Sequence, residues 1–354
     1  MLDSLTLLRA MNGIHEEDVI MAGRILMKQQ HSKGRPAKRL VTLALAAALL
    51  LALGAAAYAL SAHGAFFHAV FGTGIKGREA QDLVLSDGSD GGIPKTEHYP
   101  ASERVEVDEE QAEALTGGYV TALGQSAEAG GYTFTIREAV LDENGIGAVT
   151  VHIENPEGHR LKESGIYDGT KGEKQPLSAW LYVAGDETNF LDNREYLIPE
   201  SFTETEADYV YYITPFRPLP AGTDLSFRFK VNDEPKPFPS WPTAVLTLPA
   251  QERLPARTMS GEGVRASLSP LGIALYAERE LMEESLVLRY ADGSEYTVMG
   301  DDTANITLGS RGLDERTSYY CFNRLAVPEN VTEIVLTGHY PVGEAFEPVE
   351  LILK

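Results

Sequence analysis

The chain has 354 residues, 43% of them hydrophobic and 8% aromatic, which is enough for two or three domains with ordinary cores. Its formal net charge of −22 argues against nucleic-acid binding, because phosphate backbones are bound by basic surfaces. There is one cysteine, Cys321, so a disulfide within the chain and a cysteine-based zinc site are both excluded. A lone cysteine in an exported domain is more typical of a small core residue than of a nucleophile, so we expect Cys321 in a core.

Residues 1–39 form a small basic segment, with seven Lys or Arg against four Asp or Glu, so the rest of the chain carries −25. Apolar residues recur at helical spacing in two short stretches before residue 30, and Asn12-Gly13 between them is a helix stop. Two helices this short cannot bury a core alone. We therefore expect their apolar side to dock on a cytoplasmic partner, the alternative being a segment that rests on lipid headgroups. The predicted partner contacts are Leu5, Leu8, Val19, Ile20 and Leu26.

An uncharged apolar run from Leu40 to Leu60 predicts a transmembrane helix over residues 40–61. As a helix, its 21 residues would extend about 31 Å, which matches the hydrocarbon core of a bilayer. Five basic residues lie between positions 28 and 39 and none between 61 and 75, so the positive-inside rule places the N-terminus in the cytoplasm. The predicted location is the cell membrane, crossed once, with the lipid bilayer as a partner and the C-terminal domains outside the cytoplasm.

The competing interpretation of this run is a cleaved signal peptide, since Ala57-Tyr58-Ala59 matches an A-x-A cleavage site. A signal peptide has only a short region before its apolar part, whereas 39 residues precede this run, and this favours the uncleaved anchor. Three aromatic residues follow the run, and we expect them at the outer membrane interface. They are Phe66, Phe67 and Phe71.

Residues 62–117 are predicted to be a helix and linker region. We expect a helix and a turn to continue to residue 83. The Gly- and Asp-rich stretch 86–95 is typical of a flexible linker, because the spacing of its acidic residues does not match a calcium loop. A short helix is predicted over 108–118, with acidic residues in its first turn and glycine after it.

From residue 118 on, the pattern changes from helical to alternating, which predicts β-strands separated by Pro and Gly clusters. Asn144-Gly145 and Asp292-Gly293 are typical of tight hairpin turns. Regular short strands without helices between them predict a mostly β fold with two tandem β-sandwich domains, residues 118–250 and 251–354. The predicted strands are 132–136, 149–153, 179–183, 209–213, 225–231 and 244–248 in the first domain, and 264–268, 272–277, 285–290, 295–299, 318–322, 332–338 and 349–354 in the second.

The sequence contains no nucleophile elbow, zinc-protease helix or phosphate loop, and no GxGxxG motif between a strand and a helix, since no strand precedes GTGIKG at 72–77. The external histidines are scattered and show no ligand spacing with a nearby carboxylate, and His152 lies on the outward phase of its strand, where we expect it to face solvent. We therefore predict a protein that is not an enzyme, with no catalytic residue, cofactor or metal site. An external enzyme with a site built from distant loops stays an alternative.

Four stretches of the chain carry a resemblance to a known family. They are LLRAMNGIHEEDVIMAGRIL, FFHAVFG, YTFTIREAVLDENGIGAVTVHIENPEG and the series ASLSPLGIAL…VLRYADGSEYTV…FNRLAVPENVTEIVLTG. They resemble a family of single-pass membrane proteins of Gram-positive bacteria with a domain of unknown function, some of them labelled anti-sigma factors. The resemblance implies an immunoglobulin-like ectodomain and a sigma factor as the cytoplasmic partner. The zinc-binding His/Cys cluster of many anti-sigma domains is absent, since no cysteine precedes Cys321, so a sigma factor would be bound by the bare helices.

The leading functional hypothesis is a bitopic membrane sensor or regulator, similar to an anti-sigma factor. The external domains would bind an unidentified ligand or protein, and the helices before residue 30 would hold a cytoplasmic partner. The alternative is an anchored adhesion or envelope-structural protein, in which the cytoplasmic segment only sets the membrane topology. Nucleic acid is not expected as a partner in either case.

Overall fold

All residues that the structure describes belong to one compact unit, which runs from Leu60 to Lys354. The predicted transmembrane helix over 40–61 and the five predicted partner contacts, Leu5, Leu8, Val19, Ile20 and Leu26, lie outside the described residues. Among the described residues, none of the helices has the length and the apolar character needed to cross a bilayer. The computed structural model describes residues 65–73, 79–86, 95–103, 105, 107–163, 175–232, 240–342 and 345–354.

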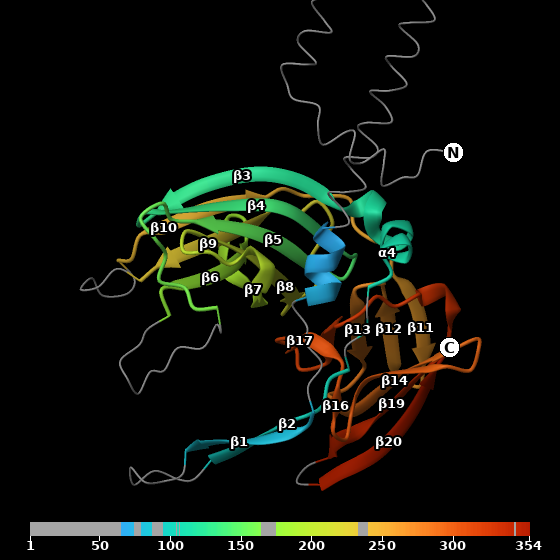
Figure 1. Ribbon diagram of the computed structural model, residues 1–354. Coiled ribbons are helices and arrows are strands. Elements are labelled where there is room, and N and C mark those ends of the chain that lie inside the picture. Colours follow the sequence, from blue (N-terminus) through green and yellow to red (C-terminus); the bar gives the residue numbers. More distant parts are fainter. Residues whose placement is uncertain are drawn as a thin grey trace, which may run out of the picture. The chain divides into compact units, whose positions relative to one another are not determined.

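The described part of the chain is mostly β, and its sheets form a β-sandwich-like architecture, as the alternating pattern predicts (Figure 1). Within the described ranges, helical structure is confined to short segments. Residues 65–67 are helical and continue into the π-helix η1 (His68–Thr73). The other helices are α4 (Glu109–Thr116), η2 (Gly117–Tyr119), η4 (Pro199–Ser201) and η5 (Pro328–Asn330).

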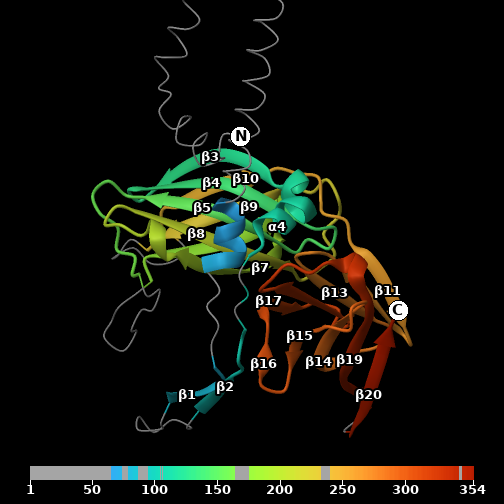
Figure 2. The ribbon, with the colours of Figure 1, turned by 45° about the vertical axis from the view of Figure 1, so that its right-hand side comes forward.

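The first group of strands forms one antiparallel sheet of eight strands, in the order β10-β9-β6-β7-β8-β5-β4-β3. The long strand β7 pairs with β6 through its first part and with β8 through its second, so it joins what would otherwise be two layers. The end strands β3 and β10 contact each other, which curls the sheet around its own core (Figures 1 and 2). The strands are β3 (Thr121–Ala129), β4 (Tyr132–Leu141), β5 (Gly147–Glu154), β6 (Leu177–Val183), β7 (Asp186–Ile198), β8 (Glu206–Pro215), β9 (Leu225–Val231) and β10 (Thr243–Leu248).

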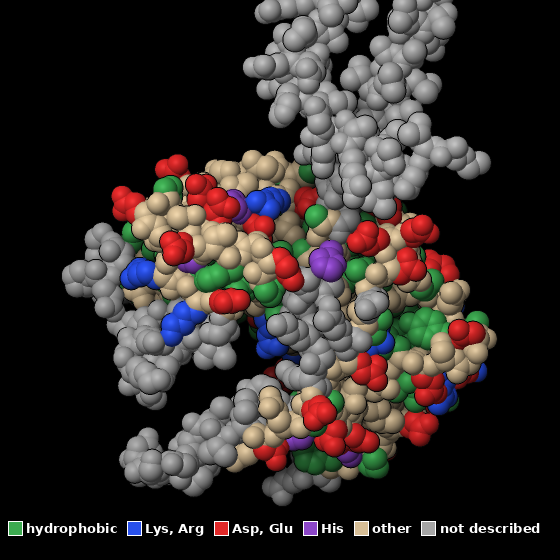
Figure 3. Space-filling model, viewed as in Figure 1, with side chains coloured by type: hydrophobic (Ala, Val, Ile, Leu, Met, Phe, Trp, Pro, Cys, Tyr) green, Lys and Arg blue, Asp and Glu red, His purple; other side chains and the backbone are tan. Residues whose placement is uncertain are grey.

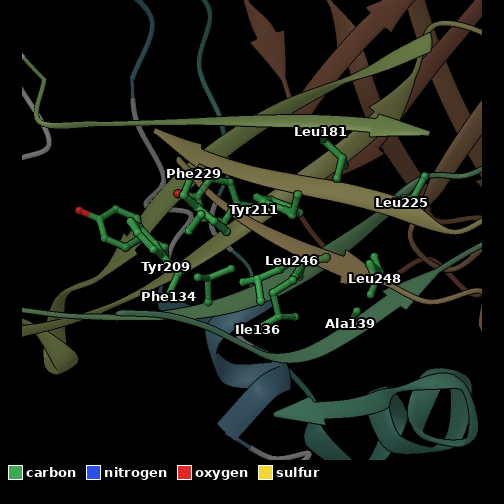
Figure 4. Close-up of a cluster of buried hydrophobic side chains, with 14 of the residues drawn as sticks. Phe134, Ile136, Ala139, Leu181, Tyr209, Tyr211, Leu225, Phe229, Leu246 and Leu248 are labelled. Atoms are coloured by element: carbon green, nitrogen blue, oxygen red, sulfur yellow. The ribbon is translucent and has the colours of Figure 1, made fainter. Parts of the chain in front are cut away.

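Aromatic and branched side chains on the inner face of this sheet form its core (Figure 4). The rings of Phe134 and Phe229 stack with their centroids 4.6 Å apart, and Tyr211 meets Phe227 edge-on at 5.1 Å. Period-two alternation puts these residues on one face, because successive side chains of a strand point to opposite sides. The other face of β4, β5 and β8 is therefore free to pack against something else.

The second group of strands forms two five-stranded antiparallel sheets with a separate hydrophobic core. The alternating pattern of apolar residues predicts most of these strands. The two predicted hairpin turns also agree with the structure: Gly145, between β4 and β5, has a φ of +85°, and Gly293, between β14 and β15, has a φ of +84°, which suits tight turns. One sheet contains β11 (Arg257–Gly261), β12 (Val264–Leu268), β13 (Gly272–Ala277), β18 (Thr317–Phe322) and β17 (Ile306–Arg311); the other contains β16 (Thr303–Ala304), β15 (Glu295–Gly300), β14 (Met282–Tyr290), β19 (Val331–Val342) and β20 (Ala345–Leu353).

The region before the first sheet differs in part from its prediction. Residues expected to be a helix, a turn and a linker instead contribute a two-stranded antiparallel sheet, β1 (Gln81–Ser86) and β2 (Lys95–Tyr99). The expected short helix is confirmed as α4. The carboxylate of Asp108 caps it by accepting a hydrogen bond of 3.0 Å from the backbone N–H of Gln111.

Candidate functional site

The helix over residues 65–73 lies in a third hydrophobic core, which joins the two groups of strands. Its aromatic side chains are almost fully buried, with 1% of Phe66, 1% of Phe67 and 5% of Phe71 exposed. The prediction that these three residues lie at the outer membrane interface is therefore wrong. Apolar side chains that follow a predicted span suit either a bilayer or a protein core, and here a protein core contains them.

Both groups of strands contribute to this third core. The strands of the first sheet contribute four buried residues on their outer face, and the strands of the second group contribute another four. Cys321 is among the latter and 3% exposed, so its predicted core position is confirmed. The first set is Val140, Ala148, Val210 and Tyr212, and the second is Ala274, Leu308, Tyr319 and Cys321.

One hydrogen bond ties the helix to the first sheet inside this core. The hydroxyl of Tyr212, on β8, donates to the backbone carbonyl of Val70. Burial raises the pKa of Tyr212 well above its ordinary value, so the hydroxyl stays a neutral donor. A π-helix is a rare form in which backbone bonds run from i to i+5, and it occurs often at functional sites.

Next to the helix, the outer face of the first sheet changes from apolar to charged. A β-bulge at Arg137 interrupts the pairing of β4 with β5 and sets this side chain facing β8. There its guanidinium lies 2.9 Å from the carboxylate of Asp208. The other oxygen of Asp208 lies 2.6 Å from Nδ1 of His152, on β5.

The placement of His152 corrects the expectation that it simply faces solvent. It lies on the outward side of the sheet, yet only 19% of its side chain is exposed, and Asp208 is its partner. The backbone N–H of Asp208 in turn donates to the hydroxyl of Ser201 at 2.7 Å. Sequence spacing gives no signal for this cluster, because its members come from three strands that meet only through sheet register.

A cavity of about 240 Å³ lies where the helix meets this charged cluster. Residues of the helix line one side, and residues of β4, β5, β7, η4 and β8 line the rest. Apolar and charged side chains both line it, so the cavity suits a small ligand with an apolar body and a polar head. The lining residues are Ala65, Phe66, His68, Ala69, Arg137, Glu138, Thr150, Val151, Ile198, Glu200 and Asp208.

A buried carboxylate connects the two groups of strands beside the third core. Asp142, after β4, accepts hydrogen bonds from the backbone N–H groups of Asn144 at 2.9 Å and Ile146 at 2.8 Å. Its other oxygen accepts a hydrogen bond of 2.6 Å from the hydroxyl of Ser269, between β12 and β13. Burial raises the pKa of Asp142 to about 6, although these hydrogen bonds act in the opposite direction.

The chain between β2 and α4 binds along the second group of strands. Ala101 forms a parallel bridge with Thr303, at the edge strand β16. The buried amide of Asn323 donates to the hydroxyl of Ser102 at 3.1 Å and to the carbonyl of Glu103 at 3.0 Å. The segment that leads from the helix to the first sheet is therefore held by the second group on its way.

Within the described ranges, no group of three or more His, Cys, Asp or Glu side chains could hold a metal ion. Burial raises the pKa of Cys321 to about 12, so this residue is a thiol and not a thiolate at neutral pH. The predicted partner contacts before residue 30 lie outside the described ranges. Within those ranges, the cavity beside the helix is the candidate site for a ligand.

Comparison with known proteins gives little further information. No protein-family model matches this chain, and no curated protein matches it. A solved structure described as the conserved domain protein from Bacillus anthracis is 15% identical, with a TM-score of 0.38, over 67% of this chain and 90% of that chain. A similarity at this level supports no argument about function.

Proposed function

We propose that this protein is a single-pass membrane sensor or regulator, similar to an anti-sigma factor, with its β-rich part outside the cytoplasm. One observation carries the proposal. The helix over 65–73 begins four residues after the expected end of the transmembrane helix at residue 61, and its large side chains are buried between the two groups of strands.

A segment that only tethers the external part to a membrane does not need to be buried between the two groups of strands. Burying a large apolar side chain contributes about 1.5–3 kcal/mol, so seating Phe66, Phe67 and Phe71 binds the helix firmly to both groups of strands. A ligand that changes how these groups pack would also change the position of the helix, since packed cores adopt discrete arrangements. The membrane helix next to it would then carry that change across the bilayer.

We assign the β-rich part to two tandem immunoglobulin-like domains, in keeping with the resemblance of the sequence. The two facing five-stranded sheets of the second group support this assignment, because immunoglobulin-like domains pack two antiparallel sheets around one core. In the first group, β7 would be the strand shared by both layers.

Inside the cell, the two short helices predicted before residue 30 would hold the partner, and a sigma factor is the partner that the resemblance implies. The apolar stripes that begin at Leu5 and Val19 are too small to form a core, which supports a docking role. The protein would release this partner when the external domains bind their ligand.

The test uses the full-length protein in its membrane. A photo-crosslinking amino acid at Met11 is activated in cells, and crosslinked proteins are identified by mass spectrometry. We expect a sigma factor, and we expect the double variant Leu8→Asp and Ile20→Asp to lose it. Thr6→Asp and Gln29→Asp add the same charge away from the apolar stripes and serve as the control, which should keep the crosslink.

The outcome separates the two functional classes. If no sigma factor or other cytoplasmic regulator is crosslinked by wild type, or if both double variants behave like wild type, the regulator proposal fails. The alternative of an anchored adhesion or envelope-structural protein then remains, since that function needs residues 1–39 only for topology.

A further inference from the structure

We propose that the cavity between the helix over 65–73 and the first sheet binds a small amphiphilic cation, such as a short-chain alkyl amine. This names a ligand class for the sensor proposed above, and it depends on that proposal only for the signalling consequence. Binding itself is a property of the external part and is measured separately.

The shape of the cavity fits a short ligand. Its volume of about 240 Å³ lies below the range of about 300–1,000 Å³ that is usual for drug-sized ligands. Phe66 and Ala69 line the side formed by the helix, and Ile198 lines the side formed by the sheet. Between these two apolar sides, an alkyl chain of a few carbons would lose its contact with water.

The charged side of the cavity selects the head group. Three carboxylates line it, those of Glu138, Glu200 and Asp208, against the single guanidinium of Arg137. Asp208 already contacts that guanidinium at 2.9 Å and Nδ1 of His152 at 2.6 Å, so the carboxylates of Glu138 and Glu200 are the ones that favour a ligand with a positive charge. An ammonium group also brings three donors, which match carboxylate oxygens and the hydroxyl of Thr150.

The charge of the whole protein favours the same ligand class. The chain after the predicted span carries −25, and acidic side chains are spread over the face of the molecule shown in Figure 3. A field of this sign raises the local concentration of cations and repels anions. A cation is therefore favoured by the local and by the long-range electrostatics.

The position of the cavity gives the ligand its effect. Ala65, Phe66, His68 and Ala69 belong to the helix, so a bound ligand contacts the helix and the sheet at the same time. A ligand that binds one arrangement of these two elements better than another shifts the equilibrium between them. It would therefore act on the segment that leads into the predicted span.

The test is calorimetric titration of the full-length protein in nanodiscs of zwitterionic lipid, with empty nanodiscs subtracted. The probes are hexylamine, hexanoate and hexanol, which share a chain and differ in charge. We expect hexylamine to bind, and to bind at least about tenfold more tightly than the other two. Glu200→Gln should weaken hexylamine binding about tenfold, because it removes one charged hydrogen-bond partner.

Two further variants make the test specific. Ala65→Trp fills the cavity from the exposed side of the helix and should abolish binding, while Glu204→Gln removes an exposed acid outside the cavity and should leave binding unchanged. Circular dichroism verifies that each variant is folded. The inference is overturned if hexylamine does not bind, if hexanoate binds equally well, if Ala65→Trp still binds, or if Glu200→Gln and Glu204→Gln are indistinguishable.

These results are distinguishable from a failure of the proposed function. Amine binding without a cytoplasmic crosslink would uphold the cavity and refute the regulator. A crosslink to a sigma factor without amine binding would uphold the regulator and refute this ligand class.

Discussion

The carboxylate of Asp142 accepts a hydrogen bond of 2.6 Å from the hydroxyl of Ser269, and this contact joins the first sheet to the second group of strands. Both residues are fully buried. The same carboxylate accepts two backbone hydrogen bonds in its own turn, so its oxygens are well satisfied. A buried polar group with this many partners holds a specific geometry, and removing it leaves several donors unsatisfied.

We predict that Asp142→Ala lowers the free energy of unfolding by about 3 kcal/mol, because two backbone N–H groups and the Ser269 hydroxyl lose their acceptor. Asp142→Asn should cost far less, since an amide keeps an acceptor for the turn and can donate to Ser269. Chemical denaturation of both variants measures the difference. Equal stability of the two would contradict a hydrogen-bonding role for this side chain.

The raised pKa of Asp142 predicts a dependence of stability on pH. The folded protein holds this proton with a pKa of about 6, above the ordinary value of 3.8, so between about pH 4 and 6 it binds more protons than the unfolded chain. This group therefore makes the protein less stable as the pH rises through that window, by about 3 kcal/mol in total. The difference between the stability curves of wild type and Asp142→Asn isolates the effect, and a flat difference would refute it.

Burial of the helix over 65–73 predicts a large effect of shortening its side chains. Phe66→Ala should lower the free energy of unfolding by about 3–5 kcal/mol, because it opens a cavity in the third core. His68→Ala changes an exposed neighbour and should stay within about 0.5 kcal/mol of wild type. Thermal denaturation compares the two. Similar small losses would mean that the helix is not seated as described.

The sequence predicts the strands that bury alternate apolar side chains, and it misses the strands that bury few. Alternating apolar residues predict strands such as β9 and β12, whose bounds agree with the structure. The pattern misses β7, since its sequence DETNFLDNREYLI is polar and the strand has only one buried residue, Leu191. Short strands at sheet edges, such as β16, are missed for the same reason, because they bury too little to show a pattern.

The candidate site depends on contacts between distant residues, and here sequence patterns have less to offer. His152 and Asp208 are 56 positions apart and become neighbours only through the pairing of β5 with β8. Phe66 carries a clear apolar signal, yet that signal is the same for a membrane interface and for a protein core. Only the fold of the strands around it decides between the two.

The hydrogen bond from Tyr212 to the carbonyl of Val70 predicts a modest loss of stability on its removal. Tyr212→Phe should cost about 1–2 kcal/mol, because the ring stays in place and a buried carbonyl loses its donor. Tyr182→Phe removes a hydroxyl from a less buried ring and should be close to neutral. Hydrogen exchange of the helix gives a second readout, and we expect faster exchange only in Tyr212→Phe. Unchanged exchange in that variant would show that the bond does not hold the helix.

The amide of Asn323 holds residues 102 and 103 against the second group of strands, and this predicts where the chain opens first when it is lost. Asn323→Ala removes both hydrogen bonds from a buried site, so we expect a loss of about 2 kcal/mol and faster proteolysis between β2 and α4. Asn330→Ala, at an exposed position, should change neither. Limited proteolysis with mass spectrometry locates the cuts. Cleavage in another region at the same rate in both variants would mean that residues 102 and 103 are held by other contacts, since opening of a segment follows the local free energy of the bonds that fix it.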